Sequence, residues 1–156
     1  MADDSDVLLY PAWREGVKRF LAQGYQEGDE IKHEWFYEAF GLDMPQPETP
    51  LRQAERTKLQ FLSAFEELRA ELLEKHQIAL ANVRGYGYRV VPAVQQTRWA
   101  EAECVEQVKS AMRKMGERLS NVNMARLDAD QRKENADALA RLSMMASMLK
   151  RAKQIT

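Results

Sequence analysis

This 156-residue chain has few histidine and cysteine residues, the types that most often take part in nucleophilic catalysis and zinc binding. His33 and His76 are the only histidines, and Cys104 is the only cysteine. Because no second histidine lies four residues from His33, the zinc-helix pattern is absent. No glycine-rich phosphate loop, nucleophile elbow or Cys/His pair occurs, and Cys104 is expected to be a small packed residue. The sequence therefore predicts a protein that is not an enzyme and that holds no metal or cofactor.

Basic and aromatic residues around two glycines form the pattern that most clearly indicates a binding site. In the stretch ANVRGYGYRVV, residues 81–91, two arginines flank Gly-Tyr-Gly. Arg84 and Arg89 suit contact with phosphate oxygens, and Tyr86 suits packing on a sugar or a base. The alternative is a hairpin whose glycines only shape a turn while Tyr88 packs inward.

A second group of polar side chains lies in the first half of a long helix predicted over residues 51–75. Its members are on the side of the helix away from the predicted core: Gln53, Arg56, Lys58, Gln60 and Ser63. Such side chains can contact base edges if the helix enters a major groove of DNA. Acidic residues further along, such as Glu67, favour the alternative of an ordinary solvated face.

The spacing of the apolar residues predicts the elements that must position these groups. Helical spacing predicts a helix over residues 12–22 and a short helix over residues 33–40, with a short extended piece at residues 30–32. Three prolines predict a loop over residues 43–50, and Thr49 is expected to cap the long helix that follows. One broad apolar face is predicted for that helix, with Phe61 beside it: Leu59, Leu62, Phe65, Leu68, Leu72 and Leu73.

After His76 the apolar residues alternate with polar ones. This period predicts two short strands joined by a tight turn at residues 85–87. Gly85 and Gly87 are expected to supply the positive φ that such a turn requires. Pro92 then closes the second strand.

Two further helices are predicted, over residues 95–119 and from Asp128 or Asp130 to about residue 153, with a break at residues 120–123. The first carries a narrow apolar seam of the coiled-coil type: Val105, Val108, Met112, Met115 and Leu119. The last presents an apolar face that includes Leu142, Met145 and Leu149. The seam can pair with the last helix or with a second copy of the chain, and we expect a homodimer because many helix-turn-helix proteins read two half-sites.

The order helix, extended piece, short helix, loop, long helix and hairpin is that of a winged helix-turn-helix domain. Residues 65–91 resemble the C-terminal half of the winged-helix DNA-binding domains of bacterial response regulators. In that family the recognition helix ends with a Leu-Arg-x-x-Leu pattern, which residues 68–72 match. The hairpin of the family has a Val-Arg-Gly-x-Gly-Tyr-Arg core, which residues 83–89 match. By motif the resemblance covers about residues 55–91.

The resemblance implies a mainly α fold with two parts. A winged helix-turn-helix domain of three helices and a small β-hairpin wing is expected over residues 11–92. Residues 93–156 then form an α-helical extension of two long helices, which is a helical hairpin or a dimerisation element. The implied partner is double-stranded DNA. The implied function is that of a small non-enzymatic DNA-binding protein, a regulator of transcription or a DNA-handling protein of a bacterium, phage or plasmid.

Composition and charge limit the other classes of function. With 45% hydrophobic and 30% charged residues, the chain has the composition of an ordinary globular protein. No stretch of about 18 uncharged apolar residues occurs, so no membrane span is predicted. The acidic N-terminus is unlike a signal peptide, and we expect a cytoplasmic protein.

The charges are unevenly distributed along the chain. Residues 1–50 hold 4 basic and 11 acidic residues, a net charge of −7, whereas residues 93–156 hold 12 and 8, a net charge of +4. The basic second part is compatible with nucleic-acid binding. The acidic first part favours an alternative, in which the chain is a protein-binding adaptor or inhibitor that uses the winged helix as a scaffold.

Overall fold

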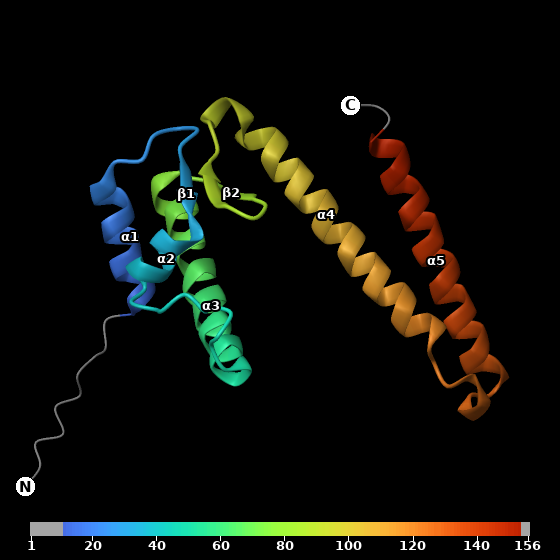
Figure 1. Ribbon diagram of the computed structural model, residues 1–156. Coiled ribbons are helices and arrows are strands. Elements are labelled where there is room, and N and C mark those ends of the chain that lie inside the picture. The colour runs from blue at the N-terminus through green and yellow to red at the C-terminus, as the bar shows by residue number, and fades with distance from the viewer. Residues whose placement is uncertain (1–10, 154–156) are drawn as a thin grey trace, which may run out of the picture. The chain divides into compact units, whose positions relative to one another are not determined.

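The computed structural model describes residues 11–153 and divides the chain into two compact units, residues 1–96 and residues 97–156 (Figure 1). The acidic start of the chain, within residues 1–10, and the last three residues of the predicted helical extension lie outside the described residues. Across the part that is described, five α-helices and a small antiparallel sheet make the chain mainly helical, as predicted.

The first unit contains three α-helices and three strands. The predicted helices and the extended piece are all present, and only the last residue of each helix differs from the prediction, by one position. In chain order the elements are α1 (Ala12–Gln23), β1 (Glu30–Lys32), α2 (His33–Ala39), α3 (Leu51–His76), β2 (Leu80–Val83) and β3 (Gly87–Val90).

The start of α3 differs from the prediction. Pro50 occupies the N-cap position, and no side chain caps the helix. The hydroxyl of Thr49 instead accepts a hydrogen bond from the backbone N–H of Gln46 at 2.9 Å. The expected Thr49 cap is therefore wrong, because this hydroxyl closes a turn within the proline-rich loop.

The buried face of α3 is narrower than predicted, and it includes Phe61, which was expected to lie beside it. Its buried residues are Phe61, Phe65, Leu68 and Leu72, at successive spacings of four, three and four. Leu59, Leu62 and Leu73 were expected on this face, but their exposed fractions are 69%, 43% and 43%. The prediction was wrong because the core is built on aromatic side chains, which turn the helix so that Phe61 faces inward.

An aromatic cluster joins α2, α3 and the sheet. The rings of Phe65 and Tyr88 stack with centroids 4.1 Å apart, and the rings of Tyr37 and Phe61 stack at 4.2 Å. Phe36 meets both Phe65 and Tyr88 edge-on, at 5.2 and 5.5 Å. Aromatic pairs at such distances stabilise a core beyond the burial of their area.

The sheet has three strands in the order β1-β3-β2, all antiparallel to their neighbours. The sequence predicted the β2–β3 hairpin and an extended piece at residues 30–32, but it did not predict that they pair. Ile31 lies opposite Tyr88, and Lys32 lies opposite Gly87. The edge strand β1 therefore lies directly against the middle of the candidate DNA-contacting hairpin.

The second unit is built from two long helices, which adjoin at their connecting segment and diverge from it in Figure 1. They are α4 (Ala93–Ser120) and α5 (Ala129–Lys153), with a short 3-10 helix, η1 (Met124–Arg126), between them. The Asp128 carboxylate accepts a hydrogen bond from the N–H of Gln131 at 2.8 Å, and the Gln131 side chain accepts one from the N–H of Asp128 at 3.1 Å. This reciprocal capping box identifies Asp128, rather than Asp130, as the cap of α5.

Replacement of Leu68 by Ala tests the position of the core face on α3. Leu68 is fully buried, so Leu68→Ala should lower the free energy of unfolding by about 2–5 kcal/mol. Leu59→Ala is the matched control and should change it by less than about 0.5 kcal/mol, because that side chain is mostly exposed. Urea denaturation followed by circular dichroism would measure both. Equal losses for the two variants would contradict the described core.

Candidate nucleic-acid interface

The tip of the β2–β3 hairpin is a tight turn over residues 84–86. The N–H of Tyr86 donates a hydrogen bond to the carbonyl of Val83 at 3.0 Å, and Gly85 has a φ of 75°. The predicted positive φ is thus confirmed at Gly85. Arg84 is exposed and Tyr86 is 38% exposed, so both side chains are available to a ligand at the tip.

Gly87 has a different role from the one predicted. Its φ is not in the positive region, and it is the first residue of β3. A Cβ at this position would collide with the backbone carbonyl of Ile31. Gly87 is therefore required for the close approach of β1, and the assignment of a turn-forming φ to it was wrong.

Lys32 is a residue of this tip that the sequence analysis missed. Its ammonium lies 6.0 Å from the centroid of the Tyr86 ring, at the limit of a cation–π contact. The carbonyl of Tyr86 accepts a hydrogen bond from the N–H of His33 at 3.1 Å, which fixes the tip to the end of β1. Only the pairing of β1 with β3 brings Lys32 here, and that pairing was not predicted.

Arg89 lies apart from the tip, in the middle strand. Its cross-strand neighbours are Glu30 on β1 and Ala81 on β2. Directly opposite side chains lie about 5 Å apart at Cβ, so an acidic residue adjoins this arginine. Arg89 is also half-buried, and it is less available to phosphate than Arg84.

Tyr88 and Val90 belong to the core. Val90 is 5% exposed, and the Tyr88 ring stacks on Phe65. Burial raises the pKa of the Tyr88 phenol, an effect that the positive charge of Arg69 opposes. The inward side chains of the hairpin therefore build the core, as one of the two interpretations expected. The tip side chains are exposed, and their contact with phosphate stays a prediction.

The polar residues predicted on α3 are all exposed, but they do not share one face. Successive residues advance by about 100° around a helix, so residues three and four apart lie together. Gln53, Arg56, Gln60 and Ser63 follow this spacing and form one row. Lys58 lies two residues from both Arg56 and Gln60, and it is therefore on the opposite flank.

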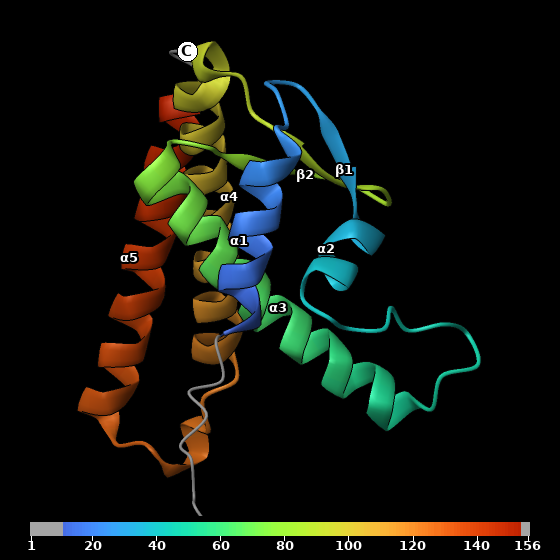
Figure 2. The ribbon, with the colours of Figure 1, turned by 90° about the vertical axis from the view of Figure 1, so that its left-hand side faces the viewer.

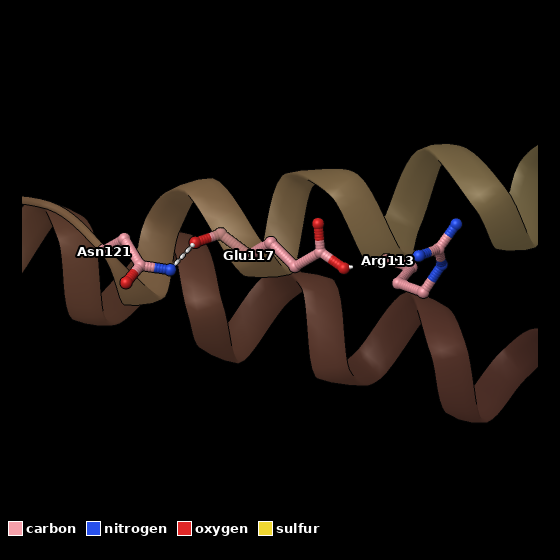
Figure 3. A network of polar contacts seen from close by, with 3 residues as sticks. All are labelled: Arg113, Glu117 and Asn121. Atoms are coloured by element: carbon pink, nitrogen blue, oxygen red, sulfur yellow. Dashed lines mark hydrogen bonds and ion pairs between the residues drawn. The ribbon is translucent and has the colours of Figure 1, made fainter.

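Arg52 is a second site residue that the sequence analysis missed. It is exposed and lies four residues before Arg56, so the two guanidinium groups share one side of α3. Local helical ion pairs hold other arginines, such as Arg19 with Glu15 and Arg113 with Glu117 (Figure 3), and within the described residues no ion pair holds Arg52, Arg56 or Arg84. These three charges are thus not neutralised by a carboxylate of the described chain.

The tip and the first turns of α3 lie on the same side of the first unit. In both Figure 1 and Figure 2, the β2–β3 turn and the beginning of α3 project away from α1. The backbone of both segments is therefore open on this side, whereas Gln60 and Ser63 of the polar row line a cavity together with Ala12 and Trp13 of α1.

The structure divides the residues predicted for helix pairing into two sets. Leu142 is buried and four others are half-buried: Val105, Met112, Leu119 and Leu149. Val108, Met115 and Met145 are exposed, by 38%, 42% and 56%. Cys104 is also exposed, so the expectation that it is packed was wrong.

No protein-family model, curated protein or solved structure matches the chain. Over the described residues, no helix is both long enough and apolar enough to cross a membrane. The same residues contain no cluster of His, Cys, Asp and Glu side chains that could hold a metal ion.

Substitution of the two hairpin glycines separates their roles. Gly87→Ala should lower the free energy of unfolding by about 3 kcal/mol, because the new methyl group displaces the backbone of β1. Gly85→Ala should cost only about 1 kcal/mol, because its Cβ meets open space and only the positive φ is strained. Urea denaturation of the two variants would measure both losses in the free energy of unfolding. A larger loss for Gly85→Ala would show that β1 does not pack against the hairpin as described.

Proposed function

We propose that this chain is a small non-enzymatic DNA-binding protein of the winged-helix type. Its role would be to regulate transcription, or to handle DNA, in a bacterium, phage or plasmid. One observation carries the proposal: Arg84 and Tyr86 at the hairpin tip are exposed, and Arg52 and Arg56 on α3 form no ion pair with a carboxylate of the described residues. The resemblance of the hairpin and of the end of α3 to response-regulator winged helices supports the same function.

The chemistry of these side chains suits the backbone of a duplex. Arg84 and Lys32 at the tip would contact phosphates, and Tyr86 would pack on a sugar or at the edge of the minor groove. The segment from Arg52 to Ser63 is about 16 Å long, which is comparable to the width of a major groove. Gln53, Arg56 and Gln60 on this segment carry the donors that base edges accept. In the proposed complex, α3 enters the groove and the tip clamps the adjacent backbone.

Arginine substitution on the proposed interface should weaken binding of a random-sequence duplex. Arg84→Ala and Arg56→Ala should each reduce affinity severalfold and lower the slope of log affinity against log salt by about 0.9. Fluorescence anisotropy with a 30-mer duplex, at about 50 and about 200 mM salt, would measure this change.

Arg19→Ala is the matched control for these variants. Arg19 is an exposed arginine on α1 that is paired with Glu15, and its loss should leave affinity within about twofold. If the unsubstituted protein does not bind the duplex at low salt, or if Arg19→Ala weakens binding as much as Arg84→Ala, the proposal is wrong.

A second candidate function, binding of a protein partner, rests on a different observation. The first half of α3 also exposes leucines: Leu51 is 73% exposed and Leu59 is 69% exposed. Beside Leu59 is an open cavity of about 830 Å³, lined by the apolar residues Trp13, Phe40 and Leu42 and also by the polar residues Gln60, Ser63 and Glu67. Exposed apolar surface next to a hollow is typical of protein-binding sites. The chain would then be an adaptor or an inhibitor on a winged-helix scaffold.

Substitutions of Leu59, compared with Arg84→Ala, distinguish the two candidates. Leu59→Asp should abolish crosslinking to a protein partner in the producing cells if the apolar surface is the binding site, and Arg84→Ala should not. If the chain binds DNA, Leu59→Ala should leave duplex affinity within about twofold, because a leucine contributes little to phosphate contacts. Retention of the crosslinked partner by Leu59→Asp would exclude the cavity as its site.

A further inference from the structure

The open cavity of the first unit lies at the start of α1. It has a volume of about 830 Å³, and its lining includes Ala12 and Trp13 of α1 with Ser63 of α3. The carbonyl of Pro11 accepts a hydrogen bond from the N–H of Arg14 at 2.9 Å, so Pro11 is held at the first turn of α1. The ten residues that precede Pro11 in the sequence therefore join the first unit at the edge of this cavity.

The residues before Pro11 are apolar next to the cavity and acidic further away. Residues 7–10 are Val-Leu-Leu-Tyr, and residues 1–6 include three aspartates. Four residues in an extended conformation span about 13 Å. The part of α3 that lines the cavity, from Leu59 to Glu67, is about 12 Å long. The apolar run therefore has the length of the cavity, and it offers apolar side chains to the apolar part of its lining.

Two arginines of α3 continue the face that lines the cavity. At about 100° per residue, the lining residues of α3 span an arc of about 140° around the helix, and both Arg52 and Arg56 fall within this arc. Glu55, which lies between them in the sequence, falls outside it. Along the helix axis, Arg56 is about 10 Å and Arg52 about 16 Å from Ser63. Both arginines are exposed, and neither forms an ion pair within the described residues.

We propose that residues 7–10 of this chain occupy the cavity, with the preceding aspartates against Arg52 and Arg56. An extended chain that starts at Pro11 reaches up to about 17 Å at Asp6, which exceeds the axial distance along α3 to Arg56. The two earlier aspartates reach further, as far as the first turn of α3.

Charge and covalent connection both favour this occupant over a separate protein. Glu67 lines the far end of the cavity, so the aspartates are repelled from that end and attracted to the end that the arginines continue. Because the segment is joined to α1 beside the cavity, it meets the cavity at an effective concentration in the millimolar range. A separate partner would have to displace the segment before it could bind there.

The docked segment would cover the row of α3 that is proposed to enter DNA. Gln60 and Ser63 of that row line the cavity, and Gln53 and Arg56 continue it. The aspartates would occupy the positions of phosphates at the arginines, so the docked segment would lower the affinity for a duplex. This effect on DNA binding rests on the proposed function, whereas the docking itself does not.

Disulfide formation within the full chain tests the docking. Every variant carries Cys104→Ser, so that no third thiol is present. Ser63→Cys is combined in turn with Leu8→Cys and with Leu9→Cys, because neighbouring side chains of an extended segment point in opposite directions. In at least one of these pairs, oxidised glutathione should form the intrachain disulfide at least about tenfold faster than when Lys58→Cys replaces Ser63→Cys.

Lys58 is the matched control position, because it is exposed and lies on the opposite flank of α3. Circular dichroism establishes that each variant is folded. Equal rates of disulfide formation at Ser63→Cys and Lys58→Cys in folded proteins would overturn the proposal.

A reversal of charge tests the direction of the segment. In the faster cysteine pair, Arg56→Glu should slow disulfide formation severalfold, because the aspartates are then repelled from this side of α3. Lys58→Glu makes the same change of charge on the opposite flank and should leave the rate within about twofold. Equal slowing by the two variants would show that the aspartates do not lie against Arg56.

Duplex binding by the crosslinked chain distinguishes the docking from the proposed function. The chain locked by the disulfide should bind a 30-mer duplex severalfold more weakly than the same chain after reduction. Equal affinities would contradict competition between the segment and DNA. A reduced chain that binds no duplex would contradict the proposed function instead, and the rates of disulfide formation would still decide whether the segment docks.

Discussion

The stack of Tyr88 on Phe65 is the contact on which the first unit depends. It joins the middle strand of the sheet to α3, and Phe36 of α2 packs edge-on against both rings. Side chains of a strand alternate between its faces, so the inward position of Tyr88 places Arg89 on the outer face. The turn before Tyr88 is thereby held beyond the edge of the core. The position of the candidate interface thus follows from one aromatic pair.

The pairing of β1 adds a second constraint. Because Gly87 has no side chain, the backbone of Ile31 approaches β3 closely, and Lys32 arrives beside the Tyr86 ring. The helix α2 begins at the next residue, His33, so this pairing also sets where α2 starts relative to the sheet. The tip is therefore supported by hydrogen bonds to two strands rather than to one, which suits a surface that must hold its shape against a ligand.

Local patterns in the sequence predicted the elements well, but they did not predict contacts between elements. Proline, glycine and helical spacing identified the helices, and the alternation after His76 identified the hairpin. The inward turn of Phe61 and the exposure of Leu59 depend on aromatic partners from α2, which the period of one helix does not contain. Lys32 was missed for the same reason, because only long-range strand pairing brings it to the tip. Arg52, in contrast, could have been predicted from the sequence, because its spacing of four residues from Arg56 places both on one side of the helix.

The proposed interface of the first unit carries only a few positive charges. One first unit offers four exposed cations to a duplex, Lys32, Arg52, Arg56 and Arg84, within a chain of net charge −1. Affinity that rests on so few phosphate contacts is low at physiological salt. The proposed function would therefore need further contacts beyond these four charges, such as those proposed for the polar side chains of α3.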